Sequence, residues 1–148
     1  MKKIIFSGIL FFLLLLTGCS LGFQYPDKSA FVLEVTISQA PYHSDETILL
    51  HCTLTNESKK DYLICHGSQA ITYSVDGSEE ATELLLISTF LASDDKITRE
   101  IEIGPLPVGY HKIEIKCPIS VTAGRSAQQT ENGKEYTYSK TFEIEVSE

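Results

Sequence analysis

The chain has 148 residues, of which 20 are Asp or Glu and 12 are Lys or Arg, so its formal net charge is −8 at pH 7. An acidic surface of this kind repels phosphate backbones and argues against nucleic acid as a partner. The length is enough for one domain with a hydrophobic core.

The first 18 residues have the pattern of an export signal. Lys2 and Lys3 precede an apolar run over residues 4–16, which is shorter than the roughly 20 residues of a membrane-spanning helix. The run ends in Leu16-Thr17-Gly18-Cys19, which resembles the lipobox of bacterial lipoproteins. That resemblance implies cleavage before Cys19 and a diacylglyceryl group on its thiol. An uncleaved spanning helix and an ordinary signal peptide with a coincidental cysteine are the less favoured alternatives.

The expected lipid supplies enough apolar surface for a stable anchor. One acyl chain binds a membrane only reversibly, whereas a diacylglyceryl group supplies two chains. Residues 19–29 show no periodicity and contain glycine and proline, so they predict a short lipidated tether. We therefore expect an extracytoplasmic protein at the cell membrane or outer membrane. Its membrane contact is expected through the lipid on Cys19 rather than through a basic face.

Strand patterns follow one another through the rest of the chain. Apolar residues alternate with polar ones in several segments, which is typical of half-buried strands. The run Leu-Leu-Leu-Ile within residues 83–92 suits either a buried strand or a short helix, and its β-branched residues favour a strand. Further strands are expected over residues 31–37, 47–55, 62–66, 70–75, 97–103, 110–117 and 136–146.

The last expected strand contains one irregularity. Lys140 occupies a position that the alternation assigns to the buried face, which predicts a β-bulge or a strand that extends beyond the core. Seven or eight short strands with turn signals between them predict an all-β fold. We expect an immunoglobulin-like antiparallel β-sandwich over residues 30–148, without the buried tryptophan of antibody domains, because the chain has none.

Several short segments resemble a bacterial group named after an intracellular proteinase inhibitor of bacilli. The segments are Leu54-Thr55-Asn56, Gly67-Ser68-Gln69, Asp76-Gly77 and Leu106-Pro107-Val108-Gly109-Tyr110-His111. Domains of that group are immunoglobulin-like, and the resemblance implies the same fold here. His111 stands where the group usually has tyrosine. The group has no short inhibitory motif that can be placed on this chain, so the resemblance assigns no inhibitory residues.

Three cysteines follow Cys19. Cys52 and Cys117 lie on apolar faces of strands that the sandwich would place in opposite sheets, where immunoglobulin domains form their inter-sheet disulfide. An exported location permits such a bond, and we expect it between these two residues. The alternatives are two buried free thiols or a Cys52–Cys65 pair.

The sequence does not indicate an enzyme. Cys65 and His66 are neighbours in an expected strand, so their side chains point to opposite faces and do not form a thiol–base pair. The histidines and cysteines lack metal-ligand spacing, and no phosphate-binding glycine loop is present, so we expect no metal and no cofactor. An unrecognised enzyme is the least favoured hypothesis.

A long polar loop over residues 118–135 is the candidate binding site. Long loops in compact domains are often functional, although a plain flexible hairpin is the alternative. The candidate binding residues are Arg125, Ser126, Gln128, Gln129 and Asn132. The sequence thus predicts a lipid-anchored extracytoplasmic binding or assembly module without catalytic activity, with a protein partner in the cell envelope. The alternative is a proteinase inhibitor or another regulator of an envelope enzyme.

Overall fold

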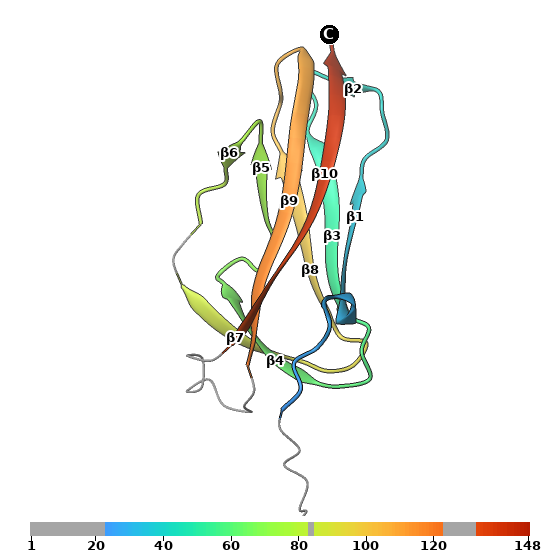
Figure 1. Cartoon of the computed structure of the whole chain (residues 1–148). Helices are drawn as coiled ribbons and strands as arrows, with labels where there is room; N and C mark the ends of the chain where they lie inside the picture. Colours follow the sequence, from blue (N-terminus) through green and yellow to red (C-terminus); the bar gives the residue numbers. More distant parts are fainter. Residues whose placement is uncertain (1–22, 83–84, 123–132) are drawn as a thin grey trace, which may run out of the picture.

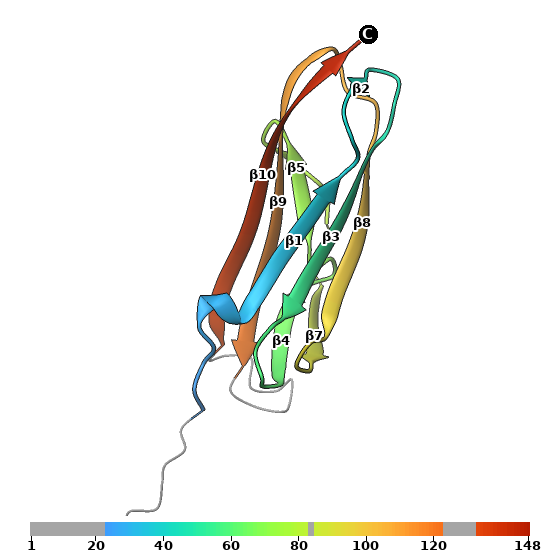
Figure 2. The same cartoon turned by 90° about the vertical axis from the view of Figure 1, so that its right-hand side faces the viewer.

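The computed structural model describes residues 23–82, 85–122 and 133–148, which form an all-β sandwich of two sheets (Figures 1 and 2). The smaller sheet has the order β1–β3–β8, and the larger has the order β2–β10–β9–β4–β7, with β5 beside β9 and β6 beside β5. The smaller sheet consists of β1 (Phe31–Ile37), β3 (Ile48–Asn56) and β8 (Lys96–Ile103). The larger sheet consists of β2 (Tyr42–His43), β4 (Tyr62–Gly67), β5 (Thr72–Val75), β6 (Ser78–Glu79), β7 (Leu86–Leu91), β9 (Gly109–Thr122) and β10 (Lys134–Ser147).

The predicted all-β sandwich is therefore confirmed, and each expected strand has a counterpart. Within residues 83–92, the strand prediction is confirmed by β7. The sequence did not predict the two-residue strands β2 and β6. Strand β2 pairs in parallel with the end of β10, whereas the other pairings are antiparallel.

Strand β10 has no bulge at Lys140. Its pairing with β9 runs without interruption from Lys134 opposite Val121 to Val146 opposite Gly109. The prediction of a bulge was wrong. An edge strand needs no bulge to carry a lysine at an inward position, because the long side chain reaches solvent at the border of the sandwich. Lys140 is exposed, whereas Tyr138 on the same face is buried.

The loop between the last two strands is shorter than expected. Strand β9 continues through Pro118 to Thr122, so the prediction that the loop begins at residue 118 was wrong. Proline lacks the N–H that a central strand would donate. Pro118 fits because β9 changes partner around it, from β5 opposite Lys116 to β4 opposite Ser120.

The core lies between the two sheets. The inward residues of β3 and β9 were predicted correctly: Leu50, Cys52 and Cys117 are fully buried. A second group of aromatic residues fills the end of the sandwich where β4 begins. Phe31 lies 5.6 Å from Tyr62 between ring centroids.

The segment before β1 packs against this aromatic end. The Phe23 ring lies edge-on to Tyr25 at 5.2 Å and to Tyr62 at 6.4 Å between centroids. The hydroxyl of Tyr138 donates a hydrogen bond of 3.0 Å to the carbonyl oxygen of Lys28, in the 3₁₀ turn η1 (Lys28–Ala30). Part of the expected tether is therefore held on the domain.

Candidate functional site

The two long sides of the sandwich are closed differently. On one side β1 and β10 approach each other, but no ladder joins them in the described ranges (Figure 2). On the other side, Arg99 of β8 is bonded to the β5–β6 region of the larger sheet. The first side offers free strand edges, and the second is fastened by side chains.

A groove of about 710 Å³ lies on the β1/β10 side. Its apolar walls come from the end of β1, the turn that follows it and the second half of β10. Two carboxylates also line it, and no Lys or Arg does. The principal lining residues are Ile37, Pro41, Tyr42, Phe142, Glu143, Ile144 and Glu145. An apolar groove with carboxylates suits an extended segment that carries apolar and basic side chains.

Towards the other end of the sandwich, the same side is lined by lysines instead of carboxylates. A smaller cavity of about 350 Å³ there is lined by Lys28, Leu33 and Lys140, among others. An inward-pointing charge on an edge strand discourages unspecific strand pairing. Lys140 therefore protects this part of the β10 edge, while the groove beyond Phe142 remains open.

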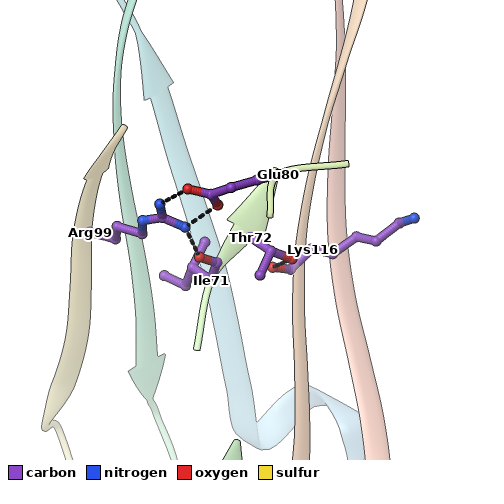
Figure 3. Close-up of polar contacts among 5 residues, drawn as sticks. All are labelled: Ile71, Thr72, Glu80, Arg99 and Lys116. Carbon is purple, nitrogen blue, oxygen red and sulfur yellow. Dashed lines mark hydrogen bonds and ion pairs between the residues drawn. The ribbon is translucent and has the colours of Figure 1, made fainter. Parts of the chain in front are cut away.

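Arg99 fastens the opposite side of the sandwich (Figure 3). Its two terminal nitrogens bind the two carboxylate oxygens of Glu80, one of them at 2.8 Å, and one nitrogen also donates to the carbonyl oxygen of Ile71. The side chains of Arg99 and Glu80 are only 20% and 17% exposed. A two-pronged, charge-assisted pair of this kind fixes geometry as well as adding energy.

The alternation along β8 contains a sequence signal for this pair. Ile97, Ile101 and Ile103 mark the inward positions of β8, and Arg99 belongs to the same alternation. A charged residue at an inward position requires a partner. The identity of that partner, Glu80, depends on the β5–β6 hairpin and could not be derived from the spacing.

Asn56 joins the β3–β4 and β7–β8 connections at the aromatic end. Its side chain is fully buried, and its amide nitrogen donates to the carbonyl oxygens of Lys60, Leu91 and Ala92 at 2.8, 3.1 and 3.0 Å. Its amide oxygen accepts bonds from the backbone and hydroxyl of Ser58. The Leu54-Thr55-Asn56 segment therefore contributes to the structure at this end of the domain.

The Asp76-Gly77 turn prediction is confirmed. Both residues have positive φ, 51° and 82°, as a tight hairpin turn of the type I′ class requires. Asp76 also binds His111, the residue that stands where the resembled group usually has tyrosine. Hydrogen bonds from His111 and the backbone of Lys112 lower the pKa of Asp76, and the bonds to Asp76 and Pro107 raise the pKa of His111.

The expected Cys52–Cys117 disulfide is not present, and both residues are free thiols. They do lie on the inner faces of opposite sheets, as predicted, and are fully buried. Burial raises the pKa of Cys52 to about 11 and that of Cys117 to about 12. Disulfide chemistry proceeds through the thiolate, so this environment suits thiols that pack as small apolar residues.

Cys65 and His66 bind different partners. The Cys65 sulfur lies 3.3 Å from the Ser88 hydroxyl, and the His66 Nε2 lies 2.8 Å from the Thr89 hydroxyl. His66 Nδ1 also approaches the carbonyl oxygen of Gly67 at 2.6 Å. Each ring nitrogen of His66 thus has a partner other than the thiol, and the two residues do not form a thiol–base pair.

The candidate loop residues Arg125, Ser126, Gln128, Gln129 and Asn132 lie outside the described residues, as does Cys19. Within the described ranges, no group of three or more His, Cys, Asp or Glu side chains is arranged to hold a metal ion. Likewise, no helix among the residues that the structure describes is long and apolar enough to cross a membrane. No family model matches the chain, and no curated protein matches it.

Proposed function

We propose that this protein is a lipid-anchored, extracytoplasmic binding or assembly module without catalytic activity. The observation that carries the proposal is the Leu16-Thr17-Gly18-Cys19 sequence placed directly before a single β-sandwich domain. Two acyl chains on Cys19 would hold the domain at the membrane.

The groove between β1 and β10 is the proposed binding surface. It combines apolar walls with Glu143 and Glu145 and lies beside the β10 edge, which pairs with another strand only at Val146 and Ser147 among the described residues. Such an edge can accept an extended polypeptide as an added strand, and the side-chain pockets then provide specificity. The proposed partner is a cell-envelope protein that presents an extended segment with apolar and basic residues.

Fatty-acid labelling tests the anchor. Wild-type protein should incorporate the label and fractionate with membranes, and Cys19→Ala should do neither. Continued labelling of Cys19→Ala would show that the assigned lipidation site is wrong.

Site-specific crosslinking tests the groove. A photoreactive residue at Thr141, which lines the groove and is exposed, should give one discrete crosslinked product in intact cells. The control is the same residue at Leu49, which is 45% exposed on the outer face of the other sheet. Equal crosslinking from both positions, or none from Thr141, would exclude the groove as the binding surface.

Proteinase inhibition is the second candidate function, and one loop favours it. Residues 104–109 contain Pro105 and Pro107, and His111 Nε2 lies 2.7 Å from the carbonyl oxygen of Pro107. Val108 in this restrained loop is 56% exposed. A restrained exposed loop lowers the entropic cost of binding a protease cleft. The test is inhibition of secreted and envelope proteases by the purified protein, with Val108→Asp as the control variant.

A further inference from the structure

Exposed apolar side chains gather around β7. Leu86 and Phe90 are 65% and 59% exposed, and they share the outer face of β7 because they are four positions apart. Leu85, just before the strand, is 57% exposed. Phe23 in the N-terminal segment is 42% exposed and lies at the other end of the strand, against Tyr62, which pairs with Leu91. We call these four residues the β7 patch.

Strand β7 also differs from the other edge strands in charge. It pairs only with β4 within the described ranges, and none of its residues, Leu86–Leu91, is charged. The other sheet edges carry charged residues, such as Glu34 on β1, Glu100 on β8 and Lys140 on β10. Soluble proteins commonly place charge on exposed edges to prevent pairing, so an uncharged, apolar edge indicates a surface that is covered.

The end of β7 that pairs with the beginning of β4 lies near the start of the described chain (Figure 1). The rings of Phe23 and Tyr62 are in contact, with centroids 6.4 Å apart. Tyr62 is directly opposite Leu91 in the β4–β7 ladder, and Phe90 is the next residue. Phe23 and the end of β7 therefore belong to one end of the domain.

The length of the tether then restricts what can cover this end. This step rests on the proposed lipidation of Cys19. Phe23 lies four positions after Cys19, and an extended chain advances at most about 3.6 Å per residue. Phe23 therefore lies within about 14 Å of the membrane surface.

The distribution of charge agrees with a membrane-facing end. Five lysines lie at or beside strand ends near Phe23: Lys28, Lys59, Lys60, Lys96 and Lys134. Acidic residues also occur there, among them Asp61 and Asp94, so positive and negative charges are nearly balanced. The opposite end, by contrast, is predominantly acidic, with Glu102, Glu143 and Glu145. Anionic headgroups therefore repel the Phe23 end least.

We propose that the β7 patch contacts the bilayer surface beside the lipid anchor, with Phe23, Leu86 and Phe90 inserted among the headgroups. The bilayer is a partner of matching chemistry, because exposed apolar side chains bind interfaces through buried apolar area, and the near balance of charge at this end opposes that contact little. The acyl chains determine that the domain is at the membrane, and the patch determines which face it turns towards the lipid.

Tryptophan fluorescence tests this contact, because the chain contains no tryptophan. The test variant is Phe90→Trp, and the control is Tyr110→Trp, since Tyr110 is 78% exposed at the opposite end of β9. Both lipidated proteins are reconstituted in vesicles of phosphatidylethanolamine and phosphatidylglycerol with brominated acyl chains. Bromine should quench Phe90→Trp several-fold more strongly than Tyr110→Trp.

Equal, weak quenching of both variants in protein that floats with the vesicles would overturn the contact but leave the anchor intact. Protection of Phe90→Trp from both bromine and aqueous iodide would also overturn it, because a protein surface would then cover β7. Protein that carries no lipid and does not float would refute the anchor and, with it, this contact.

Discussion

His111 and Asp76 form an ion pair, with 2.8 Å between Nδ1 and Oδ2, that ties the β5–β6 turn to the beginning of β9. The other ring nitrogen of His111 binds the carbonyl oxygen of Pro107 at 2.7 Å. A carboxylate and a carbonyl both accept hydrogen bonds, so His111 satisfies both only when each nitrogen carries a proton. The charged imidazolium is therefore the form that the folded protein stabilises.

Stability should consequently depend on pH through this pair. The raised pKa of His111 gives a contribution that is fully present below its ordinary value of 6.5 and is lost as the pH rises through the raised value. The lowered pKa of Asp76 gives a contribution present above 3.8 and lost as the pH falls through the lowered value. The free energy of unfolding, measured with urea, should therefore be higher for the wild type than for His111→Gln. This difference should be largest between pH 3.8 and pH 6.5. A difference that stays constant from pH 5 to pH 9 would contradict this.

Loss of the Arg99 contacts should destabilise the sandwich. Arg99→Met removes both bonds to Glu80 and the bond to the Ile71 carbonyl, and leaves a half-buried carboxylate without its cation. We expect the free energy of unfolding to fall by about 1.5–3 kcal/mol, a range reduced for partial solvent exposure. Glu80→Gln keeps the shape and one acceptor and should cost about 1 kcal/mol. An Arg99→Met protein as stable as wild type would show that the pair contributes nothing.

Asn56 should be more sensitive than any surface residue. Asn56→Ala removes its three donated and two accepted bonds at a fully buried position, and we expect a loss of about 2–4 kcal/mol in urea unfolding. The matched control is Ser58→Ala, which removes the hydroxyl bonds but leaves the Asn56 amide bonds to Leu91 and Ala92. Equal losses for the two variants would show that those amide bonds are not the source of the effect.

The thiols should be free but unreactive in the folded protein. In a Cys19→Ser chain, a disulfide reagent should find three thiols after denaturation without reductant, namely Cys52, Cys65 and Cys117. In the native state at pH 8, Cys52 and Cys117 should react at least about tenfold more slowly than in the denatured state, because burial raises their pKa to about 11 and about 12. A count of one thiol would instead indicate a bond between them.

The period-two patterns predicted the sandwich because burial alternates regularly along its strands. Leu50, Cys52 and Leu54 in β3, and Ile113, Ile115 and Cys117 in β9, are fully buried as the alternation required. The Asp76-Gly77 turn was equally predictable, since positive φ at two successive residues restricts the choice of amino acid.

The remaining features depend on contacts between distant segments. Pro118 is normally evidence against a central strand, and only the change of partner along β9 makes it acceptable. An inward cysteine forms a disulfide or stays a free thiol according to its distance from another cysteine and the redox conditions. The alternation pattern therefore could not show which of these states Cys52 and Cys117 adopt. The groove, likewise, follows from the absence of a ladder between β1 and β10 in the described residues, which no single strand pattern encodes.

The length of β10 determines how far the groove stands above the lipid. Ile144, in the groove wall, follows Lys134 by ten residues, which corresponds to about 33 Å along an extended strand. In an anchored molecule with Phe23 at the bilayer, the groove therefore projects beyond the headgroup layer into the surrounding medium. A soluble polypeptide can reach it freely, whereas a partner embedded in the same membrane needs an ectodomain of comparable height.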